Sequence, residues 1–314
     1  MGARAGALVI ATVLLVLPGA CGGGGEPAPS PASALPAGTT RQAIAWGGRK
    51  RTYLLHRPYL AVGSRPPLVI VLHGATLTAD QTERYYHWDP LANANGFVVA
   101  YPQGIDNAWN AGSCCGDAPD LGTDDVGFVA AVMADAAARS DADPLRRYLT
   151  GVSNGAMMTL RYQCERPKQL AAIGAVAGTL TSSCDHPAAV PFVAIHGLDD
   201  QVVSFAPDSG TVEGGPAIRL PASETISRFQ AADSCHDPVT LTKGVVHIQT
   251  STCSPGLDVE VITIDGAGHQ WPGARIDQAR LARDGPHDQP SPAIDATSEL
   301  WTFFAGHSLA QATP

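Results

Sequence analysis

The sequence predicts a doubly wound α/β domain on a mostly parallel sheet, and three observations support this fold class. Hydrophobic residues make up 45% of the 314 residues and charged residues only 16%, which is enough apolar material for a large core. Short β-branched runs such as LVIVL at 68–72 are apolar throughout, as expected for strands buried on both faces of a parallel sheet. Longer segments with helical periodicity lie between these runs, and this alternation is typical of doubly wound folds.

The individual elements follow from these patterns. The segment 124–139 carries one apolar stripe at helical spacing, and Thr123 or Asp124 can cap its N-terminus. The Gly-, Pro- and Asp-rich stretches at 104–122 and 204–221 are expected to be loops, where folds of this kind build their sites. The expected strands are 68–72, 97–101, 147–150, 171–176, 191–195 and 259–264, and the other expected helices are 154–163, 223–232 and 296–304.

The N-terminus has the composition of an export signal, so residues 1–20 are the expected signal peptide. Arg4 supplies a positive charge, and the apolar run at 7–17 is too short to span a bilayer as a mature helix. Small residues then precede Cys21. The stretch resembles a bacterial lipobox, in which the Cys is lipidated, although Pro18 stands where that motif has Leu. We expect export with a lipid anchor at Cys21, and plain secretion is the alternative.

A linker is expected between this segment and the folded domain. Residues 22–38 consist mainly of Gly, Pro, Ala and Ser, which cannot bury a core. We therefore expect the candidate lipid anchor and a flexible linker at 21–40, followed by an α/β domain at 41–314. An anchored domain would face the outer side of the cytoplasmic membrane and would contact that membrane only through the lipid.

Cysteine usage agrees with an oxidising compartment. Of the seven cysteines, six remain when Cys21 is set aside, an even number that favours disulfides. The loop lengths favour Cys164–Cys184 and Cys235–Cys253, each contributing about 3 kcal/mol of stability. The adjacent Cys114 and Cys115 then pair with each other or stay reduced, and a crossed pairing with Cys164 or Cys184 is the alternative. No Cys-x-x-Cys motif is present, so no metal site is expected.

The charge distribution argues against one class of partner. The net charge is −9 and is spread along the chain without acidic or basic blocks. A nucleic-acid partner would select a clustered Lys and Arg face, so none is expected. The acidity is explained by solubility alone, and the oligomeric state stays open.

The motif Gly151-Val152-Ser153-Asn154-Gly155 is the main functional signal. It lies between an expected strand and an expected helix, which is the context of a nucleophile elbow. Such a tight turn lifts the Ser hydroxyl clear of the backbone and places it at a helix N-terminus. A Gly-rich turn of purely structural role is the alternative, but the flanking elements favour Ser153 as a nucleophile in an α/β-hydrolase fold.

A serine nucleophile needs a base, and that base needs an orienting acid. In this fold the chain order is Ser, acid, His. His269 is the expected base, because it follows the last strong strand in a Gly-rich loop, and His287 is the alternative. The acid is expected after the strand 191–195, where Asp199 and Asp200 are both candidates. Neighbours on an extended chain point in opposite directions, so only one of them can reach the base.

Backbone donors complete the expected site. His73-Gly74-Ala75 follows the strand 68–72, and the Gly allows backbone N–H groups to face the nucleophile. The N–H groups of Ala75 and Asn154 are expected to form an oxyanion hole.

Together these motifs resemble the polyhydroxybutyrate-depolymerase-like esterases, a family that also includes feruloyl and acetylxylan esterases, and most closely their actinobacterial lipoprotein branch. The resemblance runs from about residue 50 to 305. The motifs that carry it are Leu72-His73-Gly74, Tyr101-Pro102-Gln103-Gly104, WNAGSCCG at 109–116, Asp124-Asp125-Val126-Gly127-Phe128, the Ser153 elbow, His196-Gly197-x-x-Asp200-x-x-Val203 and Gly268-His269-Gln270-Trp271-Pro272-Gly273.

The resemblance implies an α/β-hydrolase with Ser153, Asp200 and His269 as its catalytic residues. The His-Gly-x-x-Asp pattern falls on Asp200 and not on Asp199. One departure concerns fungal members that join two cysteines beside the nucleophile and the catalytic His. Val152 and Gln270 occupy those places here, so feruloyl specificity tied to that disulfide is not implied.

Further residues of the same motifs are assigned to the surroundings of the site. Thr76, Trp109 and Trp271 are the expected substrate-pocket residues, with loop packing as the alternative for Trp271. Asp124 and Asp125 are expected to satisfy N–H groups at a helix N-terminus or to brace the elbow.

The expected activity is hydrolysis of carboxylic esters through an acyl-enzyme, without a metal or an organic cofactor. Small-molecule or oligomeric esters are the expected partners, with short-chain, hydroxyacyl or hydroxycinnamoyl acyl groups. A serine peptidase of the prolyl-oligopeptidase type is one alternative, although no repeat supports its propeller domain. A non-catalytic binding lipoprotein of the cell envelope is another, but no triad member is missing.

Overall fold

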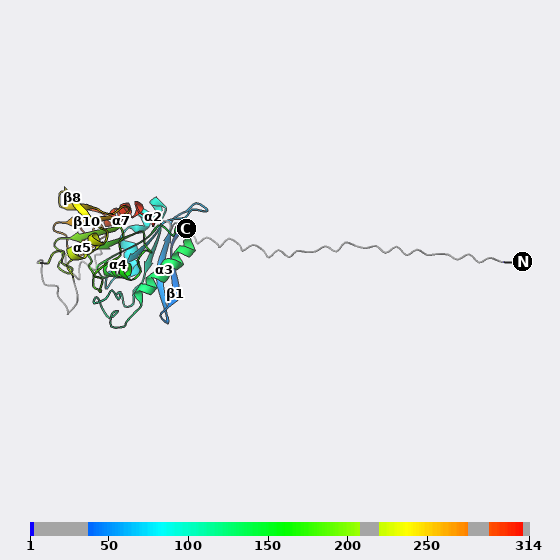
Figure 1. Cartoon of the computed structure of the whole chain (residues 1–314). Helices are drawn as coiled ribbons and strands as arrows, with labels where there is room; N and C mark the ends of the chain where they lie inside the picture. The colour runs from blue at the N-terminus through cyan, green and yellow to red at the C-terminus, as the bar shows by residue number, and fades with distance from the viewer. Residues whose placement is uncertain (3–36, 208–219, 276–288, 310–314) are drawn as a thin grey trace. The chain divides into compact units, whose positions relative to one another are not determined.

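A sheet forms the centre of the domain (Figure 1). It has ten strands in the order β1-β2-β4-β3-β5-β6-β7-β10-β9-β8. The computed structural model describes residues 1–2, 37–207, 220–275 and 289–309. The chain divides into two units, Met1–Ala34 and Leu35–Pro314, and the sheet belongs to the second. The strands from β4 to β10 in this order pair in parallel, and antiparallel pairs extend the sheet at both edges. This is a mixed, mostly parallel α/β-hydrolase sheet.

The elements follow one another as strands and helices along the chain. The strands are β1 (Gly38–Trp46), β2 (Arg49–Arg57), β3 (Leu68–Leu72), β4 (Val98–Pro102), β5 (Arg147–Val152), β6 (Ala172–Val176), β7 (Phe192–Gly197), β8 (His236–Lys243), β9 (Val246–Thr252) and β10 (Asp258–Ile264). The helices are α1 (Ala79–Tyr85), α2 (Trp88–Asn95), α3 (Asp125–Ser140), α4 (Asn154–Glu165), α5 (Ala222–Ala232) and α7 (Ala296–Ala305).

The predicted strands and helices are all present, with ends that differ by no more than two residues. The structure adds β1, β2, β8, β9 and the helices α1 and α2, which the sequence patterns did not indicate. The edge strands lack a continuous apolar run, since every residue of β8 is exposed and β1 alternates half-buried and exposed residues. Strand β1 begins at Gly38, so the last residues of the predicted linker 21–40 belong to the sheet.

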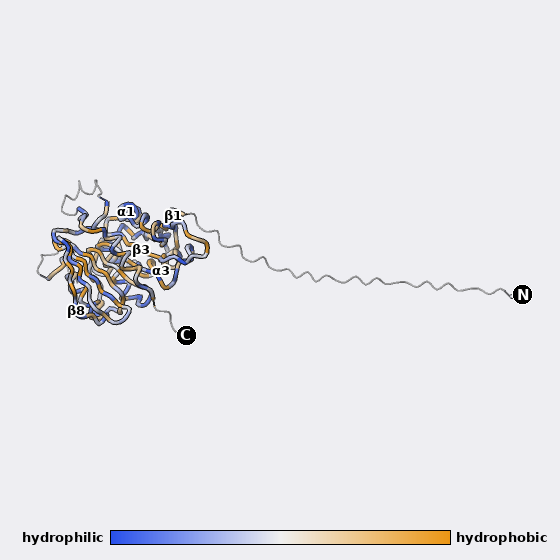
Figure 2. Tube along the Cα trace, turned by 90° about the horizontal axis from the view of Figure 1, so that it is seen from above, coloured by the Kyte–Doolittle hydropathy of each residue, from blue (hydrophilic) through white to orange (hydrophobic). Residues whose placement is uncertain are grey.

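The sheet is covered on both faces, as the apolar strands predict. Leu68, Ile70 and Leu72 of β3 pack into one buried cluster, with side chains of α3, α4 and α5. Val69 and Val71 of the same strand pack into a second cluster, with side chains of α2 and α7. Figure 2 shows hydrophobic stretches of the chain, in orange, within the domain. Since side chains alternate along a strand, β3 contributes to both cores at once.

Of the three disulfides among the described residues, two are the predicted pairs. Cys164 bonds to Cys184, and Cys235 bonds to Cys253. The adjacent Cys114 and Cys115 are also joined, so the crossed alternative is not the observed pairing. No helix in the described ranges is long and apolar enough to cross a membrane. Residues 3–20 of the predicted signal peptide and Cys21 lie outside the described residues.

Candidate active site

Ser153 occupies the turn between the end of β5 and the start of α4. Its backbone has φ 54° and ψ −122°, a conformation that few non-glycine residues adopt. A Cβ at Gly151 would lie 2.6 Å from the carbonyl carbon of Gly155, so the turn leaves no room for a side chain there. The predicted elbow is therefore present, and the Ser153 side chain projects from a strained turn at the N-terminus of α4.

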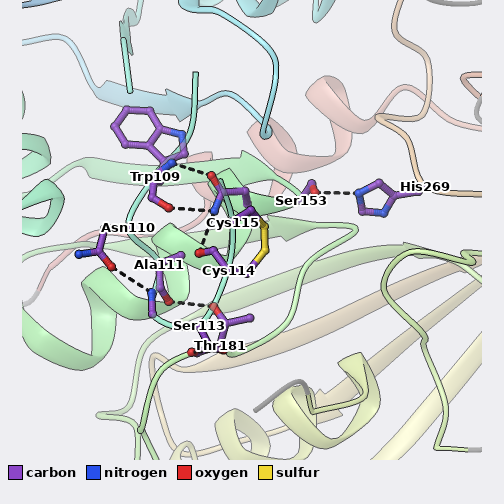
Figure 3. Close-up of a disulfide and its surroundings, with 11 residues drawn as sticks. Trp109, Asn110, Ala111, Ser113, Cys114, Cys115, Ser153, Thr181 and His269 are labelled. Carbon is purple, nitrogen blue, oxygen red and sulfur yellow. Dashed lines mark hydrogen bonds between the residues drawn. A yellow bond between two sulfur atoms is a disulfide. The ribbon is translucent and has the colours of Figure 1, made fainter. Parts of the chain in front are cut away.

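The imidazole of His269 links Ser153 to Asp200. His269 Nε2 lies 2.7 Å from Ser153 Oγ, and His269 Nδ1 lies 2.8 Å from Asp200 Oδ2. Figure 3 shows the first of these contacts. In the neutral imidazole, Nδ1–H donates to the carboxylate and Nε2 accepts from the serine hydroxyl. The three residues that sequence reasoning brought together are thus in contact, whereas the alternative base His287 lies outside the described residues.

Asp200 is the carboxylate that contacts His269, and its surroundings differ from those of Asp199. Asp200 is buried and Asp199 is exposed. Asp200 Oδ1 accepts hydrogen bonds from the N–H groups of Val202 and Val203, both at 2.8 Å. Burial alone would raise the pKa of the Asp200 carboxyl, but hydrogen bonds and charge attraction from His196 and His269 outweigh burial and hold the pKa well below its usual range. Asp200 is therefore ionised at neutral pH.

Two backbone N–H groups are available beside the serine. An ideal Cβ on Gly74 would lie 3.5 Å from Ser153 Cβ, so the loop that carries Ala75 passes directly against Ser153. Within the described residues, the backbone N–H groups of Ala75 and Asn154 have no protein acceptor. Free donors at this place are what an oxyanion hole requires.

The imidazole of His73 connects the Ala75 loop to Gly104 through two hydrogen bonds. Its Nδ1–H donates to the Gly74 carbonyl at 2.9 Å, and its Nε2 accepts from the N–H of Gly104 at 2.9 Å. Burial lowers the pKa of His73 to about 4, so the ring is neutral at neutral pH. The Trp109 indole N–H in turn donates to the His73 carbonyl at 2.8 Å.

Of the three predicted pocket residues, the structure exposes only Thr76. Its backbone has φ 66°, and its N–H donates to the Asn107 carbonyl at 2.8 Å. Trp109 is fully buried between His73 and Phe128. Trp271 is also buried, where it stacks on Tyr86. The burial of both indoles favours loop packing over a pocket wall.

The structure also shows contacts that support the site, one of them from Arg51, which sequence reasoning did not single out. The carboxamide of Asn154 is hydrogen-bonded to the loop 109–116. Arg51 of β2 pairs with Asp125, whose other oxygen accepts from the N–H of Asn110 in the same loop. Asp124 accepts from the N–H of Gly127 and so caps α3, as predicted for this pair of acids. Among the described residues, no cluster of three His, Cys, Asp or Glu side chains could hold a metal.

Comparison with known proteins gives the family. Residues 51–192 match the family model described as "Esterase PHB depolymerase". "Putative esterase NocK" of Nocardia uniformis subsp. tsuyamanensis is 31% identical over 84% of this chain and 89% of its own length. The chain belongs to the esterase PHB depolymerase family. As a family member it is a carboxylic-ester hydrolase, and the resemblance seen in its motifs is confirmed at that level.

Other relatives of this esterase differ more. "Poly(3-hydroxyalkanoate) depolymerase C" of Paucimonas lemoignei is 27% identical over 66% of this chain and 55% of its own length. "Feruloyl esterase B" of Piromyces equi is 28% identical over 65% of this chain, which spans 39% of that longer protein. The solved acetyl xylan esterase from Aspergillus awamori shares the fold, with a TM-score of 0.55 and 17% identity over 78% of this chain and 98% of that structure.

Proposed function

We propose that this esterase hydrolyses carboxylic esters through Ser153, His269 and Asp200 by way of an acyl-enzyme. The observation that carries the proposal is the pair of contacts of the His269 ring, 2.7 Å to Ser153 Oγ and 2.8 Å to Asp200 Oδ2. This arrangement gives the serine a base and the base an orienting carboxylate.

The first half of the reaction forms the acyl-enzyme. Ser153 Oγ attacks the carbonyl carbon of the ester while its proton passes to His269 Nε2. The negative oxygen of the tetrahedral intermediate accepts hydrogen bonds from the N–H groups of Ala75 and Asn154. The intermediate then expels the alcohol, which takes the proton from His269 Nε2, and the acyl group stays on Ser153.

The second half releases the acid. A water molecule gives a proton to His269 Nε2 and attacks the acyl carbon. The new intermediate collapses, Ser153 recovers its proton, and the carboxylic acid leaves. Asp200 stays ionised throughout and stabilises the imidazolium through its Nδ1–H. Each of these steps uses only groups of the chain, the ester and water.

The proposed substrates are soluble short-chain, hydroxyacyl or hydroxycinnamoyl esters, including oligomers. The support comes from the names of the relatives, which include a poly(3-hydroxyalkanoate) depolymerase and feruloyl esterases. A rate panel tests this proposal with p-nitrophenyl butyrate, a 3-hydroxybutyrate oligomer, methyl ferulate and a peptide p-nitroanilide.

The variant Ser153→Ala is the control in that panel, with an expected loss of at least about 10³-fold in ester turnover because the covalent route is removed. Faster cleavage of the peptide than of any ester would favour the prolyl-oligopeptidase alternative. Wild-type rates no higher than that of buffer alone, for every substrate of the panel, would favour the non-catalytic binding alternative.

We further propose that the protein is exported and held at the outer face of the cytoplasmic membrane by a lipid on Cys21. The sequence supports this proposal through the apolar run at 7–17, the small residues before Cys21 and the Gly- and Pro-rich stretch after it. The variant Cys21→Ala should then appear in the medium, whereas the wild type should sediment with membranes. Equal release of both proteins would leave plain secretion as the correct alternative.

A further inference from the structure

The loop 109–116 is hydrogen-bonded to the side chain of Asn154, the residue that follows the proposed nucleophile Ser153. Asn154 is fully buried, and its Oδ1 accepts a hydrogen bond from the N–H of Trp109 at 2.7 Å. Its Nδ2 donates to the carbonyl oxygens of Trp109 at 3.0 Å and of Cys114 at 3.3 Å. Figure 3 shows Cys114 and Cys115 on this loop in the same view as Ser153 and His269. Asn154 thus contacts the loop at its beginning and near its end.

The Cys114 carbonyl belongs to the ring that the Cys114–Cys115 disulfide closes. The bond joins the side chains of adjacent residues, so the ring contains both sulfurs, both Cα and Cβ atoms and the peptide group between them. That peptide group includes the carbonyl that accepts from Asn154 Nδ2. Since a small ring with a planar peptide group has little rotational freedom, the disulfide limits the directions in which this carbonyl can point.

The preceding part of the loop is held by other contacts. The N–H of Asn110 donates to Asp125 Oδ2 at 2.8 Å, and Arg161 donates to the Asn110 carbonyl at 2.7 Å. The N–H of Ser113 donates to the Thr181 carbonyl at 2.8 Å. These contacts fix the stretch from Asn110 to Ser113. The peptide group that contacts Asn154 lies just beyond them, where the disulfide is the covalent constraint.

We propose that the Cys114–Cys115 disulfide is a positioning element for the oxyanion hole and acts through the Asn154 carboxamide. This inference rests on the proposed function, because the N–H of Asn154 is there a donor to the transition state. The carboxamide and that N–H belong to the same residue, so a fixed carboxamide restricts the orientation of the donor. Neither sulfur takes part in the bond changes of ester hydrolysis.

The expected kinetic effect is specific. An oxyanion donor acts mainly on the charge that develops in the transition state, so a less well oriented donor lowers kcat and leaves KM nearly unchanged. Complete loss of one such donor costs roughly 10²- to 10³-fold in kcat. For a donor that is present but less well oriented, we expect kcat to fall by about 10-fold.

The variant Cys114→Ser/Cys115→Ser tests this inference, with Cys235→Ser/Cys253→Ser as the matched control. Both variants lose one disulfide, but the control loses the one between the end of α5 and the end of β9. With p-nitrophenyl butyrate we expect the first variant to lose about 10-fold in kcat with KM within about twofold of wild type, and the control to keep the wild-type kcat. An unchanged kcat in the first variant overturns the inference. A raised KM with unchanged kcat also overturns it, because the disulfide would then contact the substrate.

A double-mutant cycle tests whether the effect passes through Asn154. Asn154→Asp removes the Nδ2 donor to Cys114, so removal of the disulfide in that background should have little further effect on kcat. Independent, multiplicative losses contradict the proposed route. If the double cysteine variant fails to fold, wild type treated with a dithiol replaces it. Two thiol–disulfide exchanges then give two cysteine thiols and the oxidised dithiol, and kcat should fall with thiol labelling of Cys114 and Cys115 and return on reoxidation.

These results are distinguishable from a failure of the proposed function. Wild-type protein with intact disulfides that hydrolyses no ester contradicts the proposed function. Ester hydrolysis by the wild type with the same kcat with and without the Cys114–Cys115 bond contradicts the inference alone.

Discussion

The guanidinium of Arg51 donates a hydrogen bond to the carboxylate of Asp125 at 2.6 Å, with both side chains almost fully buried. Arg51 also lies 3.6 Å above the ring of Phe128 and donates to the Gln103 carbonyl. Asp125 in turn accepts from the N–H of Asn110, so the ion pair supports the same loop 109–116 that Asn154 contacts. The pair joins β2 to the N-terminus of α3.

We expect Arg51→Met to lower the free energy of unfolding by about 3–5 kcal/mol, because it leaves a buried carboxylate without its cation. Urea unfolding measures this change. The exposed pair Arg41–Asp80 provides the control, and Arg41→Ala should change stability by less than about 1 kcal/mol. Arg51→Met/Asp125→Asn should be less destabilised than Arg51→Met alone. An Arg51→Met variant as stable as the control would show that the ion pair contributes little.

The buried acid should be distinguishable from its exposed neighbour by mutation. Asp200→Asn keeps the size of the side chain but removes the charge that stabilises the His269 imidazolium, so kcat should fall by roughly 10³- to 10⁴-fold. Asp199→Asn should retain nearly the wild-type kcat, since Asp199 is exposed. Steady-state kinetics on p-nitrophenyl butyrate compare the two variants. The reverse ranking would move the role of the acid to Asp199.

Asp233 should make stability depend on pH. Burial raises the pKa of its carboxyl to about 7, and its Oδ2 has no hydrogen-bond partner among the described residues. The folded state therefore binds this proton more tightly than the unfolded state does. The free energy of unfolding is therefore highest, as far as Asp233 is concerned, below about pH 4, where the carboxyl is protonated in both states. It falls as the pH rises from 4 to 7, and the total loss is at most about 4 kcal/mol.

The variant Asp233→Asn isolates this effect because it cannot ionise. Its free energy of unfolding, relative to wild type, should increase between pH 5 and pH 8. The difference in free energy of unfolding between the two proteins has to be measured, because His73 changes the stability of both with pH in the opposite direction to Asp233. Burial lowers the pKa of His73 to about 4, so its contribution to stability is lost as the pH falls from about 6.5 to 4. Parallel stability curves for wild type and Asp233→Asn would contradict the prediction.

The sequence was sufficient for the parts of the fold and site that depend on local pattern. The apolar strands and the Gly-x-Ser-x-Gly turn predicted the centre of the sheet and the position of Ser153. The choice of Asp200 over Asp199 needed the family pattern, because it depends on a loop in which the N–H groups of Val202 and Val203 turn toward one carboxylate.

Other features depend on contacts between distant residues, which no local pattern reveals. Arg51 and Asp125 are 74 positions apart, and nothing near Arg51 distinguishes it from an exposed arginine of an edge strand. Trp109 and Trp271 were assigned to the substrate pocket from the family motifs that contain them, with loop packing as the alternative for Trp271. Their burial follows from the way these loops fold back onto His73 and Tyr86. The exposed strand β8 lacks the apolar signal by which the inner strands were recognised.

The parallel pairing of β7 with β10 has a consequence for refolding. The two strands align Gly197 with Ile264, and the loops that follow them carry Asp200 and His269, which are 69 positions apart. A slip by one residue would displace one strand by about 3.3 Å and turn its side chains to the opposite face. Such distant pairings form slowly compared with local hairpins such as β8–β9. Recovery of ester turnover after dilution from denaturant should therefore lag behind the return of the circular dichroism signal. The time at which turnover returns marks the formation of the native β7–β10 pairing.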